Sequence, residues 1–188
     1  MKTLTLLAST LLAFASSALA GTGDFVLKKV DVQFVTTPQY SGSPPDRQVK
    51  PSKWMMIDVT FDALPEFTNE LTLNYYILFA RRTFVGHVNH VSIQKGRDLH
   101  SVAFMSPKAI AQIMQGKQVT NADLDNVTVT ITAPGVSAPV SIKSLKGAPG
   151  EWWAAQKQEE GFVLNKSETP WGPLSWDYYE AVKPSASR

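Results

Sequence analysis

The three histidines are the residues best suited to bind a metal ion or to move a proton. His87 and His90 are three positions apart, and His100 follows nearby. On a β-strand, side chains alternate between the two faces, so an offset of three puts the two rings on opposite sides of the sheet. They can share a metal only if this stretch is a loop, and the further ligands of a structural site are not evident. We therefore expect surface or hydrogen-bonded histidines and no metal.

Acidic side chains form the second group with chemical potential. Asp123, Asp125 and Asn126 are spaced like part of a calcium loop, but the glycine and the terminal glutamate of that loop are missing. A turn with Asx hydrogen bonds explains them better. Three carboxylate pairs are typical of solvated faces, although the two carboxylates of a glycosidase need not be close in sequence. These pairs are Glu66 with Glu70, Asp58 with Asp62, and Glu159 with Glu160.

No nucleophilic or cofactor motif is recognisable. The sequence has no Gly-x-Ser-x-Gly elbow, no His-Glu-x-x-His, no phosphate-binding loop and no cysteine. We therefore expect a protein that is not an enzyme and has no cofactor. A hydrolase without a recognisable motif remains an alternative.

Aromatic residues are concentrated near the C-terminus. Four of the five tryptophans follow residue 150, which is too many for a disordered tail. We expect residues 169–176 to wrap the domain and close its core, because each ring buries a large apolar area. The alternative is an exposed aromatic surface that binds sugar rings or a partner protein. The candidate residues are Trp152, Trp153, Trp171, Trp176, Tyr178 and Tyr179.

A proline-rich stretch at residues 36–53 is the second candidate binding region. Few of its residues are apolar, and loops of this length are usually disordered or functional. A mobile linker is the simpler interpretation. The alternative is a mobile binding loop with Tyr40, Pro44, Pro45, Asp46 and Arg47 at its centre.

The first 20 residues have the pattern of a cleavable signal peptide. Lys2 is followed by an apolar run from Leu4 to Ala15, and Ala18-Leu19-Ala20 supplies the small residues of a cleavage site. This run is shorter than the roughly 20 residues that span a bilayer, so a retained anchor is the weaker alternative. The 168 residues that remain suffice for one domain with a core.

The charge balance of the mature chain excludes several classes of partner. Loss of Lys2 leaves 17 basic residues against 16 acidic ones, so the basic surface that nucleic acid or anionic lipid needs is absent. No later apolar run is long enough for a transmembrane helix. With no cysteines, an exported fold depends on its core alone.

Hydrophobic periodicity of two dominates the chain and predicts antiparallel strands. The clearest runs are residues 57–61, 71–79 and 127–131, and residues 126–145 resemble a hairpin around Pro134-Gly135. Further strands are expected at 84–93 and 99–105, with a turn at Gln94–Asp98 between them. In the first strand the buried phase changes at Lys28-Lys29, which predicts a β-bulge.

One helix is expected after Ser106, which can cap it, with Pro107 in its first turn and Gly116 at its end. A second short helix is expected near Glu151. Seven or eight short strands indicate an all-β, immunoglobulin-like antiparallel sandwich, with a small barrel as the alternative. The expected organisation is a signal peptide at 1–20, the sandwich at 21–150, and a Trp-rich segment at 151–188 packed on it.

The signal ending Ala18-Leu19-Ala20, the strand run Leu71 to Ala80 and the tail Trp171 to Val182 carry a resemblance. The chain resembles a secreted immunoglobulin-like protein of mucin-dwelling Verrucomicrobia, of the Akkermansia type, associated with a type IV pilus-like gene cluster. The resemblance implies a sandwich related to pilus components, with no catalytic residues. A pilin keeps its apolar helix after processing, whereas this apolar run precedes the cleavage site, so an accessory or surface role fits better.

Together, these patterns predict a noncatalytic exported interaction protein, an accessory or component of a pilus-like or adhesive apparatus. We expect a protein partner in the envelope or on the cell surface, bound through strand edges or loops. A carbohydrate-binding module that uses the C-terminal aromatic residues is the alternative. The expected location is the periplasm, the outer-membrane surface or the extracellular space.

Overall fold

The computed structural model describes residues 23–40, 51–136, 138–147 and 151–183. The expected signal peptide, and Pro44, Pro45, Asp46 and Arg47 of the proline-rich stretch, lie outside these ranges. Within them the chain forms seven strands, one α-helix and two 3-10 helices. In chain order these are β1 (Phe25–Thr36), β2 (Lys53–Phe79), β3 (Arg82–Met105), α1 (Pro107–Met114), η2 (Asn121–Asp123), β4 (Leu124–Thr132), β5 (Ser141–Ser144), β6 (Gln158–Glu159), β7 (Val163–Asn165) and η3 (Lys166–Glu168).

The long hairpin of β2 and β3 organises the fold. The strands pair antiparallel from Met55 opposite Met105 to Phe79 opposite Arg82. Only Ala80 and Arg81 connect them, and both have positive φ, as tight hairpin turns require. The expected short strands are therefore joined into two long ones.

Near its middle the hairpin bends back on itself. The register of β2 against β3 shifts between Phe61 and Phe67, and Ser92 and Asp98 of β3 have φ values of 57° and 55°. These local irregularities absorb the bend while pairing continues on both sides of it. The prediction of a strand-ending turn at Gln94–Asp98 was therefore wrong, because β3 runs through this stretch.

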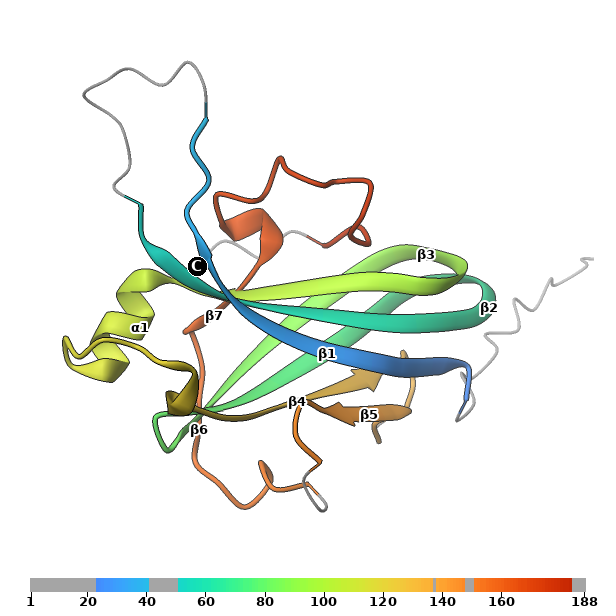
Figure 1. Ribbon diagram of the computed structural model, residues 1–188. Helices are drawn as coiled ribbons and strands as arrows, with labels where there is room; N and C mark the ends of the chain where they lie inside the picture. The colour runs from blue at the N-terminus through green and yellow to red at the C-terminus, as the bar shows by residue number, and fades with distance from the viewer. Residues whose placement is uncertain (1–22, 41–50, 137, 148–150, 184–188) are drawn as a thin grey trace, which may run out of the picture.

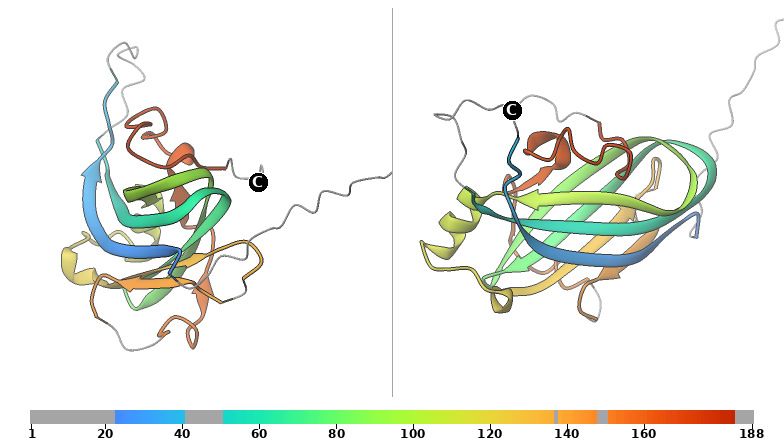
Figure 2. Two further views of the ribbon diagram at one scale, coloured as in Figure 1. Left: turned by 90° about the vertical axis from the view of Figure 1, so that its right-hand side faces the viewer. Right: turned by 45° about the horizontal axis from the view of Figure 1, so that its top comes forward.

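The bend turns a single seven-stranded sheet into two facing layers (Figures 1 and 2). The edge of β2 that faces away from β3 pairs with β1 in its first half and with β4 in its second half. We call the half with β1 the first layer and the half with β4 and β5 the second layer. The expected all-β antiparallel sandwich is confirmed. Its core is lined by alternate residues of β2, which are Met55, Ile57, Val59, Phe61, Leu71, Leu73, Tyr75, Ile77 and Phe79.

The predicted bulge in β1 is confirmed. Leu27 lies opposite Phe61 and Lys29 opposite Thr60, so Lys28 is the extra residue. The bulge restores the buried phase of the strand: Phe25 and Leu27 before it and Val30 after it all enter the core.

The predictions for the shorter elements were partly right. In α1, the Ser106 hydroxyl accepts a hydrogen bond from the Ala109 amide at 3.1 Å, and Gly116 closes the helix with a φ of 79°. The hairpin of β4 and β5 is present, but β5 is only four residues long. No helix begins at Glu151, because the described residues there form a turn closed by the Ala154 amide and the Glu151 carbonyl.

The C-terminal residues complete the free edge of β3. β7 pairs with Ala103 to Met105, and β6 pairs in parallel with Thr83 and Phe84. An ion pair between Arg82 and Glu159 supports the β6 contact. The segment after residue 150 is therefore part of the sheet as well as a cover for it.

A substitution at Gly86 can test how closely β7 packs against β3. A Cβ atom at Gly86 would lie 2.4 Å from Cβ of Val163, whereas one at Gly147 would meet nothing within 4 Å. We expect Gly86→Ala to lower the free energy of unfolding by about 1–3 kcal/mol, because the strands must separate. Gly147→Ala should change it by less than about 0.5 kcal/mol. Urea unfolding of both variants measures this, and equal midpoints would contradict the packing.

Candidate functional site

The last described residues form a strap, here defined as residues 170–183, that crosses the first layer and joins the two halves of β3 (Figure 2). The Glu180 amide donates to the His100 carbonyl, and the Val91 amide donates to the Ala181 carbonyl, both at 3.0 Å. The Lys183 amide donates to Asn89 at 2.7 Å. Because Val91 and His100 lie on opposite sides of the bend, the strap connects the two layers.

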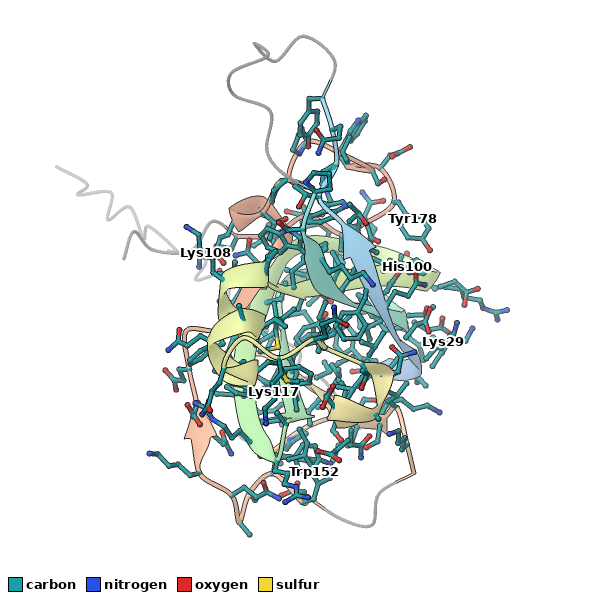
Figure 3. The ribbon with its side chains drawn as sticks, turned by 60° about the vertical axis from the view of Figure 1, so that its left-hand side comes forward. Lys29, His100, Lys108, Lys117, Trp152 and Tyr178 are labelled. Carbon is teal, nitrogen blue, oxygen red and sulfur yellow. The ribbon has the colours of Figure 1, made fainter. Side chains whose placement is uncertain are left out.

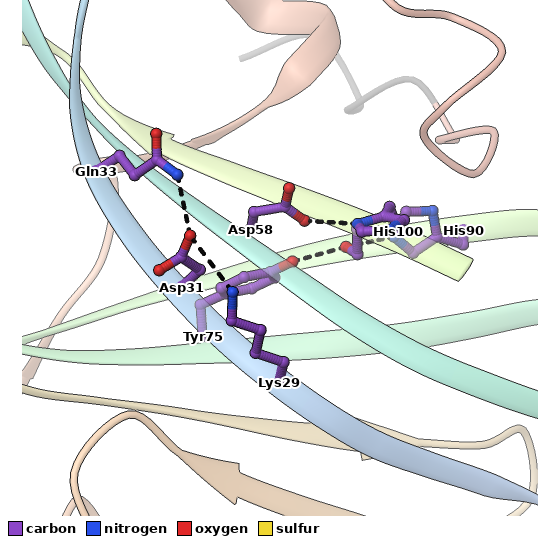
Figure 4. Close-up of polar contacts among 8 residues, drawn as sticks. Lys29, Asp31, Gln33, Asp58, Tyr75, His90 and His100 are labelled. Carbon is purple, nitrogen blue, oxygen red and sulfur yellow. Dashed lines mark hydrogen bonds and ion pairs between the residues drawn. The ribbon is translucent and has the colours of Figure 1, made fainter. Parts of the chain in front are cut away.

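A buried chain of hydrogen bonds lies beneath the strap (Figure 4). Nδ1 of His90 is 3.2 Å from the carbonyl oxygens of both Glu180 and Ala181. Carbonyl oxygens only accept, so Nδ1 carries the proton and Nε2 accepts from the Ser101 hydroxyl at 2.6 Å. Ser101 in turn accepts from the Tyr75 hydroxyl at 2.6 Å. The chain thereby fixes the tautomer of His90.

The Ser101–His90 pair has the atoms of a nucleophile and its base, but no access to a substrate. Ser101 is 0% exposed and His90 is 1% exposed. Burial lowers the pKa of His90 to about 4 and raises that of Tyr75, so all three side chains stay neutral at physiological pH. The pair therefore holds the strap to the core.

The expectation that the rings of His87 and His90 lie on opposite faces of the strand is confirmed. His87 is exposed while His90 is buried, so the two rings lie on opposite faces of β3. Nδ1 of His87 donates to the side-chain oxygen of Asn74 at 2.7 Å. Among the described residues, no group of three His, Cys, Asp or Glu side chains is arranged to hold a metal.

A half-buried polar group lies on the outer face of the first layer. Nδ1 of His100 is 3.0 Å from Asp58, and the Tyr178 ring stacks on His100 at 4.1 Å between centroids. Burial and the Asp58 charge raise the pKa of Tyr179 beside them. Asp31 lies directly across from Asp58 in the β1–β2 register. The two carboxylates that the sequence suggested as a pair therefore have different partners. Asp58 belongs to this group, whereas Asp62 forms a separate ion pair with Lys28.

Further along this face, Trp171 packs in an aromatic cluster. Its ring stacks on Phe104 at 4.9 Å and meets Trp54 edge-on at 5.3 Å. The Trp54 indole donates to Thr37 at 3.1 Å. Trp171 therefore covers the outer face of the first layer, and does not enter the core between the layers.

The six candidate aromatic residues do not form one surface (Figure 3). Trp152 and Trp153 lie against the second layer, where Trp153 stacks on Tyr76 at 4.7 Å and Trp152 donates to Thr128 at 2.8 Å. Trp171, Trp176, Tyr178 and Tyr179 belong to the strap. Grouping these residues by sequence position alone therefore joins residues that the fold separates.

Four large apolar side chains, three on the strap and one at residue 40, are exposed to solvent. Trp176 is 79% exposed and Tyr178 is 49% exposed, and Tyr40 and Leu174 are also exposed. The Tyr40 hydroxyl donates to the Pro170 carbonyl, which joins residue 40 to the start of the strap. We call Tyr40, Leu174, Trp176 and Tyr178 the aromatic patch. The expectation that Trp176 closes the core was wrong.

The acidic turn before β4 behaves as the Asx interpretation predicts. The Asp123 carboxylate accepts from the backbone and side chain of Thr120 at 2.7 and 2.8 Å. The Asn126 side chain accepts from the amides of Val127 and Lys146 at 2.9 and 3.0 Å. These contacts order the start of β4.

Comparison with known proteins identifies the family. A family model matches residues 16–186. The chain belongs to this family. A crystal structure from Akkermansia muciniphila has a TM-score of 0.73 and 19% sequence identity, and the match covers 86% of this chain and 94% of that one. At this identity the likeness establishes the fold, and the expected Akkermansia-type resemblance is confirmed. No curated protein matches the chain.

The family is of an exported type. Among the described residues, no helix has both the length and the apolar character needed to cross a membrane.

The buried chain of hydrogen bonds can be tested by removing the Ser101 hydroxyl. Ser101→Ala leaves Nε2 of His90 and the Tyr75 hydroxyl without partners, so we expect a loss of about 2–4 kcal/mol in the free energy of unfolding. Thr72→Ala removes an exposed hydrogen bond to Asn89 and should cost less than about 0.5 kcal/mol. Urea denaturation compares the two variants. A Ser101→Ala protein as stable as the Thr72→Ala protein would contradict the stabilising role of these hydrogen bonds.

A pair of tryptophan variants tests the strap. Trp171→Ala should lower the free energy of unfolding by about 2–3 kcal/mol, because its ring packs on Phe104 and Trp54. Trp176→Ala should change it by less than about 0.5 kcal/mol, since that ring is exposed. Equal effects in thermal or urea melts would contradict this division.

Proposed function

We propose that the protein is a noncatalytic, exported binding protein that docks a protein partner on its aromatic patch. The observation that carries this proposal is the exposure of Trp176, at 79%, on a strap whose residues 180–183 are hydrogen-bonded to β3 on both sides of its bend. A large ring held in water by an ordered backbone is costly unless another surface covers it. Tryptophan and tyrosine are also the residues enriched at the centres of protein interfaces.

The composition of the patch favours a protein partner. Leu174 and Tyr40 add exposed apolar area to that of Trp176 and Tyr178. Asp177 lies between the two aromatic residues and contributes the polar rim that such interfaces carry. The partner's matching surface is therefore apolar at its centre, with a donor group for Asp177.

The noncatalytic part of the proposal is supported by burial. Ser101 and His90 have the chemistry of a nucleophile and a base, yet no substrate can reach them. Asp58 and His100 are nearer the surface, but the Tyr178 ring covers His100. Both arrangements stabilise the strap.

The proposed context is an accessory or surface component of a type IV pilus-like or adhesive apparatus. The support is the resemblance to the Akkermansia-type protein and its pilus-like gene cluster. A leader that is cut after its apolar run would leave no helix for a filament core. The protein would then attach to such an apparatus from outside, through the patch or a strand edge.

A carbohydrate is the second candidate ligand, because one broad ring of Trp176 is free to stack on a sugar. Tyr178 is less suited to this role, since His100 already occupies one face of its ring. This leaves one free aromatic platform with few neighbouring polar groups, which favours the protein partner.

Capture experiments test the proposal. The immobilised protein should retain a defined partner from envelope extract of the cells that make it, and Trp176→Ala should lose at least about nine-tenths of the capture, as expected for a central interface residue. Phe67→Ala is the matched control, because Phe67 is 54% exposed on β2 and outside the patch. It should capture as the wild type does.

Three results would contradict the proposal. Equal capture by wild type and Trp176→Ala would remove the patch as the interface. Specific binding on a glycan array that is lost in Trp176→Ala would replace the protein partner with a sugar. Turnover in a panel of glycosidase and peptidase substrates would show that the protein is an enzyme.

A further inference from the structure

The contact between His90 and the strap combines a titratable ring with two backbone carbonyls. The ring belongs to β3, while both carbonyls, of Glu180 and Ala181, belong to the strap. Val182 also pairs with His90 through the backbone as an isolated bridge. His90 is therefore the side chain through which the core holds the end of the strap.

We propose that this contact is an acid-sensitive closure: protonation of His90 releases residues 180–183 from β3 while the sandwich stays folded. Nε2 of the neutral ring accepts the Ser101 proton. A proton added at Nε2 forces Ser101 to accept from His90 and to turn its own proton toward Tyr75. The Tyr75 hydroxyl then loses its acceptor in a fully buried position.

Lifting the strap removes this conflict because it lets water reach the ring. In the closed state burial holds the pKa of His90 at about 4, whereas a histidine in water has a pKa of about 6.5. Between these values the proton binds preferentially to the open state. A ligand that binds one of two states more tightly shifts the population toward it, and here the ligand is the proton.

Other titratable groups on the packed elements modify this effect. Glu180 acts in the opposite sense, because burial raises its pKa and its protonation on acidification favours the closed strap. Glu180 is only half-buried, however, while His90 is almost fully buried, so the His90 effect is the larger. The titratable and charged side chains on the elements packed around this contact are Asp58 and Tyr75 on β2, His100 on β3, and Tyr179 and Glu180 on the strap.

Few bonds hold the end of the strap, so it can open alone. Apart from the contacts of His90, its described hydrogen bonds to β3 are the three backbone ones with Val91, Asn89 and His100, and Val182 is a partly buried side chain packed on the core. The ion pair of Lys183 with Glu70 is exposed and contributes little. β2 is paired on both edges, with β3 on one side and with β1 or β4 on the other, which gives the core a higher opening free energy than the strap.

Hydrogen exchange of the purified protein tests the closure directly, whether or not the proposed partner exists. The amides of Val91 and Lys183 report the strap, and those of Ile57 and Tyr76 report the core. From pH 7 to pH 5, after correction for the intrinsic rate, strap protection should fall about 20-fold, as the two pKa values require. Core protection should stay unchanged.

Variants separate His90 from other titrating groups. His90→Gln keeps one donor and one acceptor but cannot be protonated, so the fall in strap protection should disappear. His87→Gln is the control, because His87 is exposed on the opposite face of β3, and it should behave as the wild type. In wild-type protein, the NMR titration of the His90 ring should share its midpoint with the loss of strap protection.

Each of the following results would overturn the proposal: no fall in strap protection in the wild type, an equal fall in His90→Gln, or a simultaneous fall in the core amides. Separate midpoints for the His90 ring and the strap would also overturn it. This last measurement needs no variant to fold.

Discussion

Continuous pairing of β2 with β3 through a bend is the constraint on which the other features depend. The two strands stay hydrogen-bonded on both sides of the irregular stretch from Phe61 to Phe67. Because the hairpin folds over without a break, each strand contributes to both layers, and the apolar faces of its two halves meet in one core. β1, β4 and the C-terminal strands then only extend layers that the hairpin has already placed.

The bend also creates the site of the strap. Two parts of the same β3 edge, near Val91 and near His100, are brought close enough for one short segment to bond to both. A polar chain from Tyr75 through Ser101 to His90 links this segment to the core. The same arrangement that buries these polar groups leaves Trp176 outside, so one segment both closes an edge and presents a ring to solvent.

Local patterns in the sequence predicted the local features well. The phase change at Lys28 gave the bulge, and Ser106 and Gly116 gave the ends of α1, because each depends on neighbouring residues alone. The spacing of His87 and His90 likewise gave their opposite faces. The bend was missed because Gln94 to Asp98 has a turn-like composition, and composition does not reveal whether pairing continues. The partnership of Ser101 and Tyr75 with His90 was missed because it joins residues that only the folded hairpin brings together.

The outer edge of β3 is protected from self-association only after the residues that follow it have folded onto it. An uncovered strand edge offers free amides and carbonyls to any neighbouring chain. The residues that cover β3 follow it in the chain, so a nascent chain, or one cut before residue 158, can complete its hairpin while this edge is still open. A bulky fusion placed directly after residue 183 would disturb the same covering residues. Protein in which these covering residues are left unaltered, with any tag placed elsewhere, should give the least aggregated material.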